Sequence, residues 1–310
     1  MDLQQEVSNL FVQQIKDWKL ASQNYKVLET VLSRELTVGG IKISIQFNPA
    51  RIQSTNAAVS ATAVNKRPCF LCPGNRPKEQ GYIPYNNKYL ILVNPYPIFP
   101  KHFTIPYTIH SPQQIEHHLP DMLNIASELS DYILFYNGPQ CGASASDHMH
   151  FQAGNKGFLP LEKDWEIIKN QGKILVQTKS LTVFHLPQYP QAVFIAESNK
   201  KEEIINLFDY FTTLLPIDQS SKEIMVNLLC LFDNGIWRLY IMPRKAHRPT
   251  QYYNSQKLIS PGAVDVSGVI ITPRESDFIE LTNQEAEDIL KQVSITPETT
   301  HFICDQLIKI

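Results

Sequence analysis

The segment from His148 to Gln152 carries the side chains best suited to chemistry. Successive side chains of a strand point to opposite faces, so a strand here would place His148, His150 and Gln152 on one face. Met149 and Phe151 would then point the other way, toward a core. Three neutral hydrogen-bonding groups in a row would be costly on a buried structural face. We therefore expect the first face to line a polar pocket.

A loop of small residues, 142–147, precedes this strand. Its backbone N–H groups could hold phosphate oxygens. An imidazole beside such a loop can attack phosphorus and form a covalent phosphoramidate, if the attacking nitrogen is unprotonated. Gln152 could donate to a non-bridging oxygen as charge builds on it. One alternative is a pair of structural histidines at a pocket edge. Another is a metallo-hydrolase H-x-H site, but no H-x-H-x-D pattern follows.

Cys69 and Cys72 form a C-x-x-C pair in a loop rich in proline, glycine and asparagine. This spacing lets both thiolates reach one metal ion. A redox-active pair is the alternative, but such pairs usually sit at the start of a helix in a thioredoxin-like unit. The sequence has no second C-x-x-C, so a zinc site would have to recruit histidines.

The composition, 43% hydrophobic and 19% charged over 310 residues, is typical of a soluble globular protein with a substantial core. The formal net charge of -2 gives no reason to expect binding to nucleic acid or to an anionic membrane. No apolar run is long enough for a membrane span. Five cysteines do not form a disulfide framework, and the polar residues 1–6 do not resemble a secretory signal. We expect a cytoplasmic protein.

The periodicity predicts an α+β fold with antiparallel sheets and flanking helices. Helices are expected near 2–20, from Ser111 until Pro120 ends or kinks the helix, and over 121–130, 202–215 and 282–293. Strands are expected over 25–32, 41–47, 89–93, 103–105, 132–136, 173–177, 181–186 and 192–196. The turn Asp233–Gly235 predicts a hairpin between 225–232 and 236–242, and Thr282 with Glu285 predicts a capping box.

The five residues His148–Gln152 read H-x-H-x-Q and resemble the motif of the transferase branch of the histidine-triad superfamily. That branch contains galactose-1-phosphate uridylyltransferase, diadenosine tetraphosphate phosphorylase and the GDP-hexose phosphorylases. Three other segments resemble parts of this branch in the expected order: the cysteine loop 69–75, the strand–loop–histidine–strand 94–106 and the glycine–serine loop 138–144. Segments 238–245, 260–263 and 267–268 resemble GDP-hexose phosphorylases. The layout also resembles a family of proteins of this length from gut Bacteroidetes.

The resemblance implies histidine-triad-like antiparallel sheets, with a catalytic half at 1–160 and a second half at 161–310 that lacks the motif. It implies that His150 is the nucleophile and that Gln152 contacts phosphate. The implied substrate-binding residues are Arg51, Asn94, and Ser144 or Ser146.

The uridylyltransferase also suggests a metal site. Its metal is held by two cysteines, by a histidine before a helix and by the first histidine of the motif. These positions match Cys69, Cys72, His110 and His148 here. Four protein ligands leave no open position, so the implied Zn²⁺ would be structural.

The implied reaction is a two-step nucleotidyl transfer. A nucleoside diphosphate sugar is the leading donor, and phosphate or a sugar 1-phosphate is the acceptor. A dinucleoside polyphosphate phosphorylase or hydrolase is the alternative within the class. A non-catalytic, zinc-stabilised nucleotide-binding protein is the alternative outside it. Members of this branch often dimerise, so a homodimer is a further expectation.

Overall fold

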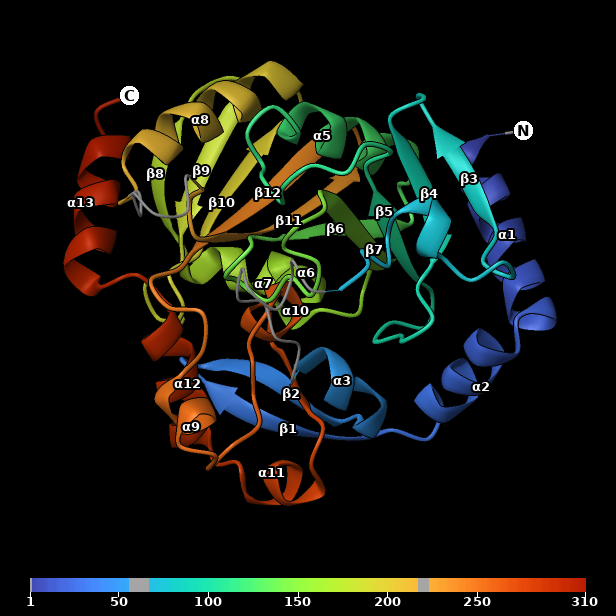
Figure 1. Ribbon diagram of the computed structural model, residues 1–310. Coiled ribbons are helices and arrows are strands. Elements are labelled where there is room, and N and C mark those ends of the chain that lie inside the picture. The colour runs from blue at the N-terminus through green and yellow to red at the C-terminus, as the bar shows by residue number, and fades with distance from the viewer. Residues whose placement is uncertain (1, 56–66, 217–222) are drawn as a thin grey trace.

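The computed structural model describes residues 2–55, 67–216 and 223–310 (Figure 1), without the side chains of residues 53 and 54. Its centre is a ten-stranded sheet in which every neighbouring pair is antiparallel. The strand order is β3 (Tyr82–Tyr85), β4 (Tyr89–Val93), β5 (His102–Pro106), β7 (His150–Asn155), β6 (Tyr132–Asn137), β11 (Val226–Asp233), β12 (Ile236–Pro243), β10 (Phe194–Ser198), β9 (Leu181–His185) and β8 (Lys173–Gln177).

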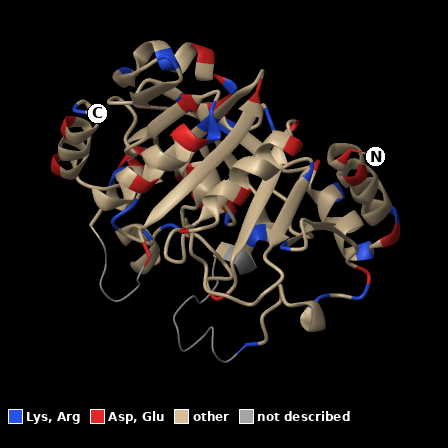
Figure 2. Cartoon of the chain, turned by 90° about the horizontal axis from the view of Figure 1, so that it is seen from above, with Lys and Arg blue, Asp and Glu red and all other residues tan. Residues whose placement is uncertain are grey.

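Two hydrophobic cores cover the two faces of this sheet. The first is closed by α1 (Leu3–Asp17), α2 (Lys19–Leu28), α5 (Leu119–Glu128), α8 (Lys201–Thr213) and α13 (Pro297–Leu307). The second includes α6 (Pro160–Lys163), α7 (Trp165–Ile168), α10 (Ala263–Val266) and α12 (Asn283–Val293). Charged residues lie mainly on the helices and loops, and the central strands carry few (Figure 2), as expected for strands buried on both sides.

A second, three-stranded sheet packs below the second core (Figure 1). It consists of β1 (Leu32–Val38), β2 (Ile41–Phe47) and β13 (Val269–Thr272), and β2 pairs with β13 in parallel. The chain leaves β2 through η1 (Pro49–Arg51) and α3 (Ile52–Thr55). The remaining short elements are η2 (Pro73–Asn75), η3 (Lys169–Gln171), α9 (Thr250–Tyr253) and α11 (Glu275–Glu280).

Several sequence predictions are confirmed. The α+β fold with antiparallel sheets is present, and so are the strands expected in the second half. Asn234 and Gly235 have φ angles of 49° and 81° between β11 and β12, which is the left-handed backbone that a tight hairpin requires. The hydroxyl of Thr282 accepts from the Glu285 N–H at the start of α12, and the Glu285 carboxylate accepts from the Thr282 N–H.

Two predictions are wrong. Residues 25–28 belong to α2 instead, because Ala21 and Tyr25 are four residues apart and bury one helical face. No helix begins at Ser111. Hydrogen bonds to residues around the motif hold the segment from Ser111 in an irregular path: the Met149 N–H donates to Ser111 O, and the Gln113 N–H donates to Ser146 O.

Pro120 does not end a helix either. It lies in the first turn of α5, where its missing N–H costs nothing. Across the described residues, no helix combines the length and the apolar character that a membrane crossing needs.

Candidate active site and metal centre

A cavity of about 560 Å³ opens beside the start of β7. Its walls come from β4, β5, β7 and β6 of the main sheet, from the junction of α1 and α2, and from the chain between β12 and β13. Of the predicted site residues, it brings together Arg51, Asn94, Ser144, His150 and Gln152. Ser146 and His148 are not among its lining residues.

His150 is the first residue of β7 and is 4% exposed. Its Nδ1 lies 2.8 Å from the backbone oxygen of His148. A carbonyl can only accept, so Nδ1 carries the proton and Nε2 keeps its lone pair. Burial lowers the pKa of His150 to about 4. The neutral ring is therefore the stable form at neutral pH.

Gln113, which the sequence analysis missed, clamps the backbone at this point. Its side chain is fully buried; Oε1 accepts from the His150 N–H at 2.8 Å, and Nε2 donates to His150 O and to Asn137 O at 3.0 Å each. The amide thus bridges the ends of β6 and β7 where their ladder has stopped. No sequence pattern marks this glutamine.

The orientation of Gln152 is set by His102, the histidine of the segment 94–106, to which the sequence analysis gave no role of its own. His102 Nδ1 accepts from the Ile98 N–H at 3.2 Å, so the proton of the neutral ring is on Nε2. That N–H donates to Gln152 Oε1 at 2.9 Å. Burial lowers the pKa of His102 to about 3, so the ring stays neutral. The Gln152 NH₂ group is left to donate to a ligand.

The loop between β6 and β7 forms one wall through Gly142, Ala143 and Ser144. Gly142 has a φ of 98°, and a Cβ there would lie 2.6 Å from Gly262 Cα. Only glycine permits this close approach of two backbones. The contact brings the loop against the chain before α10, which forms the adjoining wall.

Asn94 and Arg51 are both held through Tyr96. Asn94 Oδ1 accepts from the Tyr96 N–H at 2.9 Å, and Asn94 Nδ2 donates to Thr104 Oγ1 at 3.0 Å. Arg51 Nη1 donates to Tyr96 O at 2.8 Å. The sequence prediction that both face the substrate is compatible with these positions and stays a prediction.

Four further polar residues line the cavity: Arg67, His247, Arg248 and Asp265. Arg248 Nε donates to Ser260 Oγ at 2.8 Å, and Arg67 pairs with Asp147 at 2.8 Å. Asp265 accepts from the Gly262 and Ile271 N–H groups, and burial raises its pKa to about 6. None of the four was predicted from the sequence, because all lie outside the segments recognised there.

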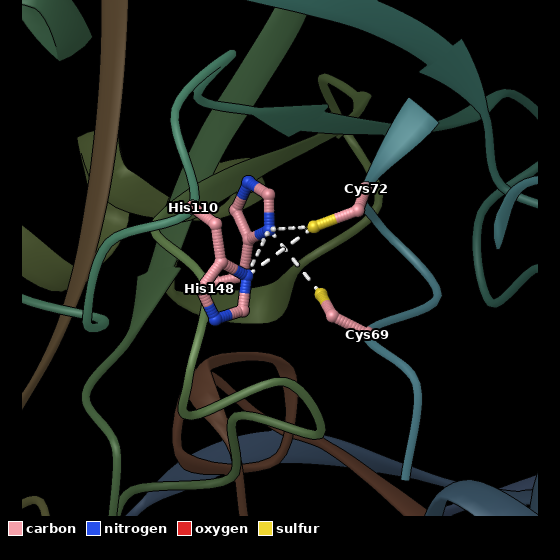
Figure 3. Close-up of side chains that lie close together, drawn as sticks. All are labelled: Cys69, Cys72, His110 and His148. Carbon is pink, nitrogen blue, oxygen red and sulfur yellow. Dashed lines mark hydrogen bonds between the residues drawn. The ribbon is translucent and has the colours of Figure 1, made fainter. Parts of the chain in front are cut away.

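Cys69, Cys72, His110 and His148 meet in a single cluster (Figure 3). Their ligand atoms all lie within 4.8 Å of one another. His148 Nδ1 is 3.2 Å from Cys69 Sγ, 3.6 Å from Cys72 Sγ and 3.3 Å from His110 Nδ1. Tetrahedral Zn²⁺ bonds place two ligand nitrogens about 3.3 Å apart, and sulfur about 3.6 Å from nitrogen. The cluster could therefore hold a metal ion.

His148 links this cluster to His150. Its Nε2–H donates to Tyr107 O at 2.7 Å, which leaves Nδ1 free to bind a metal. Its backbone oxygen accepts from His150 Nδ1. The expectation that His148 shares a face with His150 is wrong, because β7 begins only at His150. The turn before it directs the His148 side chain to the cysteines.

Comparison with known proteins supports this architecture. One family model, a domain of unknown function (DUF4922), matches residues 10–155, and the model of the GDPGP1-like C-terminal domain matches residues 167–310. Yeast Ap4A phosphorylase Apa2 is similar in structure, with a TM-score of 0.65 at 16% identity over 95% of this chain and 96% of that chain. These matches and the shared fold support the resemblance to the transferase branch of the histidine-triad superfamily. No curated protein sequence matches it significantly.

Two complexes of the yeast enzyme show the same likeness to this chain. The complex with Ap4A has a TM-score of 0.64 at 17% identity, covering 95% of this chain and 99% of that chain. The complex with AMP has a TM-score of 0.63 at 15% identity, covering 92% and 96%. Both matched family domains contribute to the cavity, since His150 lies in the first and Arg248 and Asp265 lie in the second.

Proposed function

We propose that the protein transfers a nucleotidyl group through a covalent intermediate on His150, with a nucleoside diphosphate sugar as donor. The observation that carries the proposal is the hydrogen bond from His150 Nδ1 to His148 O. It leaves the Nε2 lone pair as the reactive atom of a neutral imidazole at the wall of the cavity.

In the first step, Nε2 attacks the α-phosphorus of the donor. The Nε2–P bond forms, the bond from phosphorus to the bridging oxygen breaks, and the sugar 1-phosphate leaves with the bonding electrons. The Nδ1–H stays on the ring and faces His148 O, which stabilises the positive charge that the ring acquires. The Gln152 NH₂ donates to a non-bridging oxygen as negative charge builds on it.

In the second step, an oxygen of phosphate or of a sugar 1-phosphate attacks the same phosphorus. The Nε2–P bond breaks, its electrons return to the imidazole, and the nucleotide leaves on the acceptor. Arg67, Arg248 and the Ser144 loop lie on the cavity walls and supply donors for these phosphates. Arg51 and Asn94 contact the donor.

We also propose that the cluster of Cys69, Cys72, His110 and His148 binds Zn²⁺ as a structural ion. Two thiolates and two imidazoles form a complete tetrahedral set with no position left for substrate. When bound, the ion would cross-link the loop of residues 69–72 to the chain just before the nucleophile. That link would fix the backbone oxygen that holds His150.

A dinucleoside polyphosphate is the second candidate donor. The observation in its favour is the likeness to the yeast Ap4A phosphorylase in complex with Ap4A. The same attack on an α-phosphorus would apply, with a nucleoside polyphosphate as leaving group. The two donors differ in their leaving group, so the choice depends on which leaving group the cavity walls with Arg67 and Arg248 accept.

The test is to incubate the protein with α-labelled UDP-glucose, GDP-glucose, GDP-mannose or diadenosine tetraphosphate and to measure acid-labile, base-stable label on the protein. Label from one donor should disappear in His150→Ala, with transfer falling at least about 10³-fold. His185→Ala is the matched control, because His185 is also buried but does not line the cavity. Full activity in His150→Ala would disprove the nucleophile. Intact binding without label would indicate a hydrolase or a non-catalytic binding protein.

A further inference from the structure

The wall of the cavity nearest α1 and α2 differs in character from the rest. Most of its lining residues are apolar: Trp18, Leu20, Pro77, Leu92 and Pro95, with Gln80 and Asn94 among them. The walls contributed by the β6–β7 loop and by residues 247–265 carry Ser144, Ser260, Arg248 and Asp265, and Arg67 is hydrogen-bonded to Ser144 O and paired with Asp147. Figure 1 shows α1 and α2 beside β3 and β4, away from α10. The cavity therefore has an apolar end and a polar end, with β7 between them.

Trp18 is the residue of the apolar end that can also make a polar contact. The other two indoles use their N–H groups internally: Trp165 Nε1 donates to Glu197 at 2.8 Å, and Trp237 Nε1 donates to Leu123 O at 2.9 Å. Within the described residues, the Trp18 indole N–H donates to no acceptor and is not among the buried unsatisfied atoms. Trp18 is only 4% exposed and lines the cavity, so this N–H is open to a ligand there.

The two N-terminal helices are fixed to this wall, so Trp18 is held in place. It lies between α1 and α2 in an extended conformation, with φ -106° and ψ 101°. In α2, Asn24 Nδ2 donates to Pro95 O at 2.7 Å. In α1, Gln14 donates to Glu79 O and accepts from the Gly81 N–H. These bonds join both sides of the helix junction to the segments next to Pro77 and Asn94.

We propose that Trp18 recognises the base of the bound nucleotide, with its indole N–H donating to an acceptor on the base. The inference rests on the proposed function, because it takes a nucleotide as the ligand. The base is the planar and least polar part of a nucleotide, and it therefore belongs at the apolar end. Phosphates and sugar hydroxyls need the donors of the polar end. The helices α1 and α2 thus complete the substrate site.

The experiment compares Trp18→Phe with wild type in calorimetric binding of UMP, GMP, AMP and ribose 5-phosphate. None of these ligands carries a phosphate group that could leave when His150 attacks, so none can form the covalent intermediate. Binding is therefore measured without turnover. Loss of one hydrogen bond should weaken the best-bound monophosphate about 3- to 10-fold, and the affinity for ribose 5-phosphate should stay within about twofold. Trp237→Phe, with its indole bound to Leu123 O, is the matched control and should change neither affinity.

Fluorescence gives an independent signal from the same proteins. The base should change the emission of wild type and of Trp237→Phe, and this change should be absent in Trp18→Phe. Equal weakening for ribose 5-phosphate and the monophosphate would show that Trp18 acts only by packing and would overturn the proposal. Unchanged monophosphate affinity, or no saturable binding of any monophosphate, would also overturn it. Trp18→Phe could lose affinity for the monophosphate alone while the wild-type protein never forms labelled His150. That result would disprove the transferase proposal and support the base subsite.

Discussion

The main sheet consists of two sets of five strands with the same order. From edge to centre, the first set is β3-β4-β5-β7-β6 and the second is β8-β9-β10-β12-β11. In each set a helix, α5 or α8, lies between the third and fourth strands of the chain. The sets differ in their last connection: residues 138–149 join β6 to β7, whereas only Asn234 and Gly235 separate β11 from β12.

This difference shows that strand order alone does not make the site. The long connection supplies the Ser144 loop and the turn that separates His148 from His150. The tight hairpin leaves no room for either feature. The second set contributes a wall instead: Arg244, 3% exposed after β12, donates to Asn227 Oδ1 at 2.7 Å and to Pro261 O at 3.0 Å. The domain boundary at 160 stays a prediction, because the sheet continues across it.

The largest expected effect distinguishes Cys69 and Cys72, which precede the first set of strands, from Cys230 in the second set. Cys69→Ser with Cys72→Ser should remove nearly all bound zinc and lower the free energy of unfolding by at least about 3 kcal/mol, because the cross-link to the His148 turn is lost. Metal analysis and denaturant unfolding measure both. Cys230→Ala, a fully buried position in β11, should destabilise the protein with its zinc content unchanged. Normal zinc in the double variant would rule out the metal centre.

Two glutamines, Gln152 and Gln191, give the next comparison. Gln152→Leu removes a donor aimed at the phosphate and should lower kcat about 10²-fold. Gln191→Leu removes a bond to Pro243 O in the second set and should lower only the free energy of unfolding, by about 1–2 kcal/mol. Steady-state kinetics and unfolding curves for both variants provide the check. A similar loss of kcat in the two would mean that Gln152 acts through packing alone.

The smallest expected effect is on the free energy of unfolding at acidic pH. His102 has a pKa of about 3 in the folded protein against 6.5 ordinarily, so below pH 6.5 the unfolded chain binds a proton that the folded chain does not. Stability therefore falls as pH falls, by about 2 kcal/mol from pH 7 to pH 5 for this one group. His185, with a pKa lowered by burial to about 4, acts in the same direction.

Unfolding of His102→Gln and His185→Gln at pH 7, 6 and 5 should show a shallower pH dependence than wild type for both variants. Only His102→Gln should also lower kcat, because it alone releases the Gln152 amide. An unaltered pH dependence in His102→Gln would contradict the assignment of a neutral buried ring.

The sequence predicted those features that depend on neighbouring residues. Alternation predicted the strands, and the Asn234–Gly235 turn predicted the hairpin. The C-x-x-C spacing indicated a metal site, but His110 and His148 were named only through the resemblance to the uridylyltransferase. Gln113, Trp18 and Arg248 were missed because their roles depend on contacts between distant segments. Residues 25–32 were assigned to a strand because Tyr25 and Val27 favour strands locally, whereas packing against the first core decides for a helix.

The parallel pairing of β2 with β13 has a consequence for synthesis of the chain. Residues 44–47 pair with residues 269–272, so the small sheet closes only after most of the protein has left the ribosome. Asp265 and Ile271, which line the cavity, arrive in the same late segment. A nascent chain that has already folded around His150 would thus hold this histidine in a cavity that is still open. Emergence of residues 265–272, rather than folding of the motif, sets the moment at which the cavity is completed.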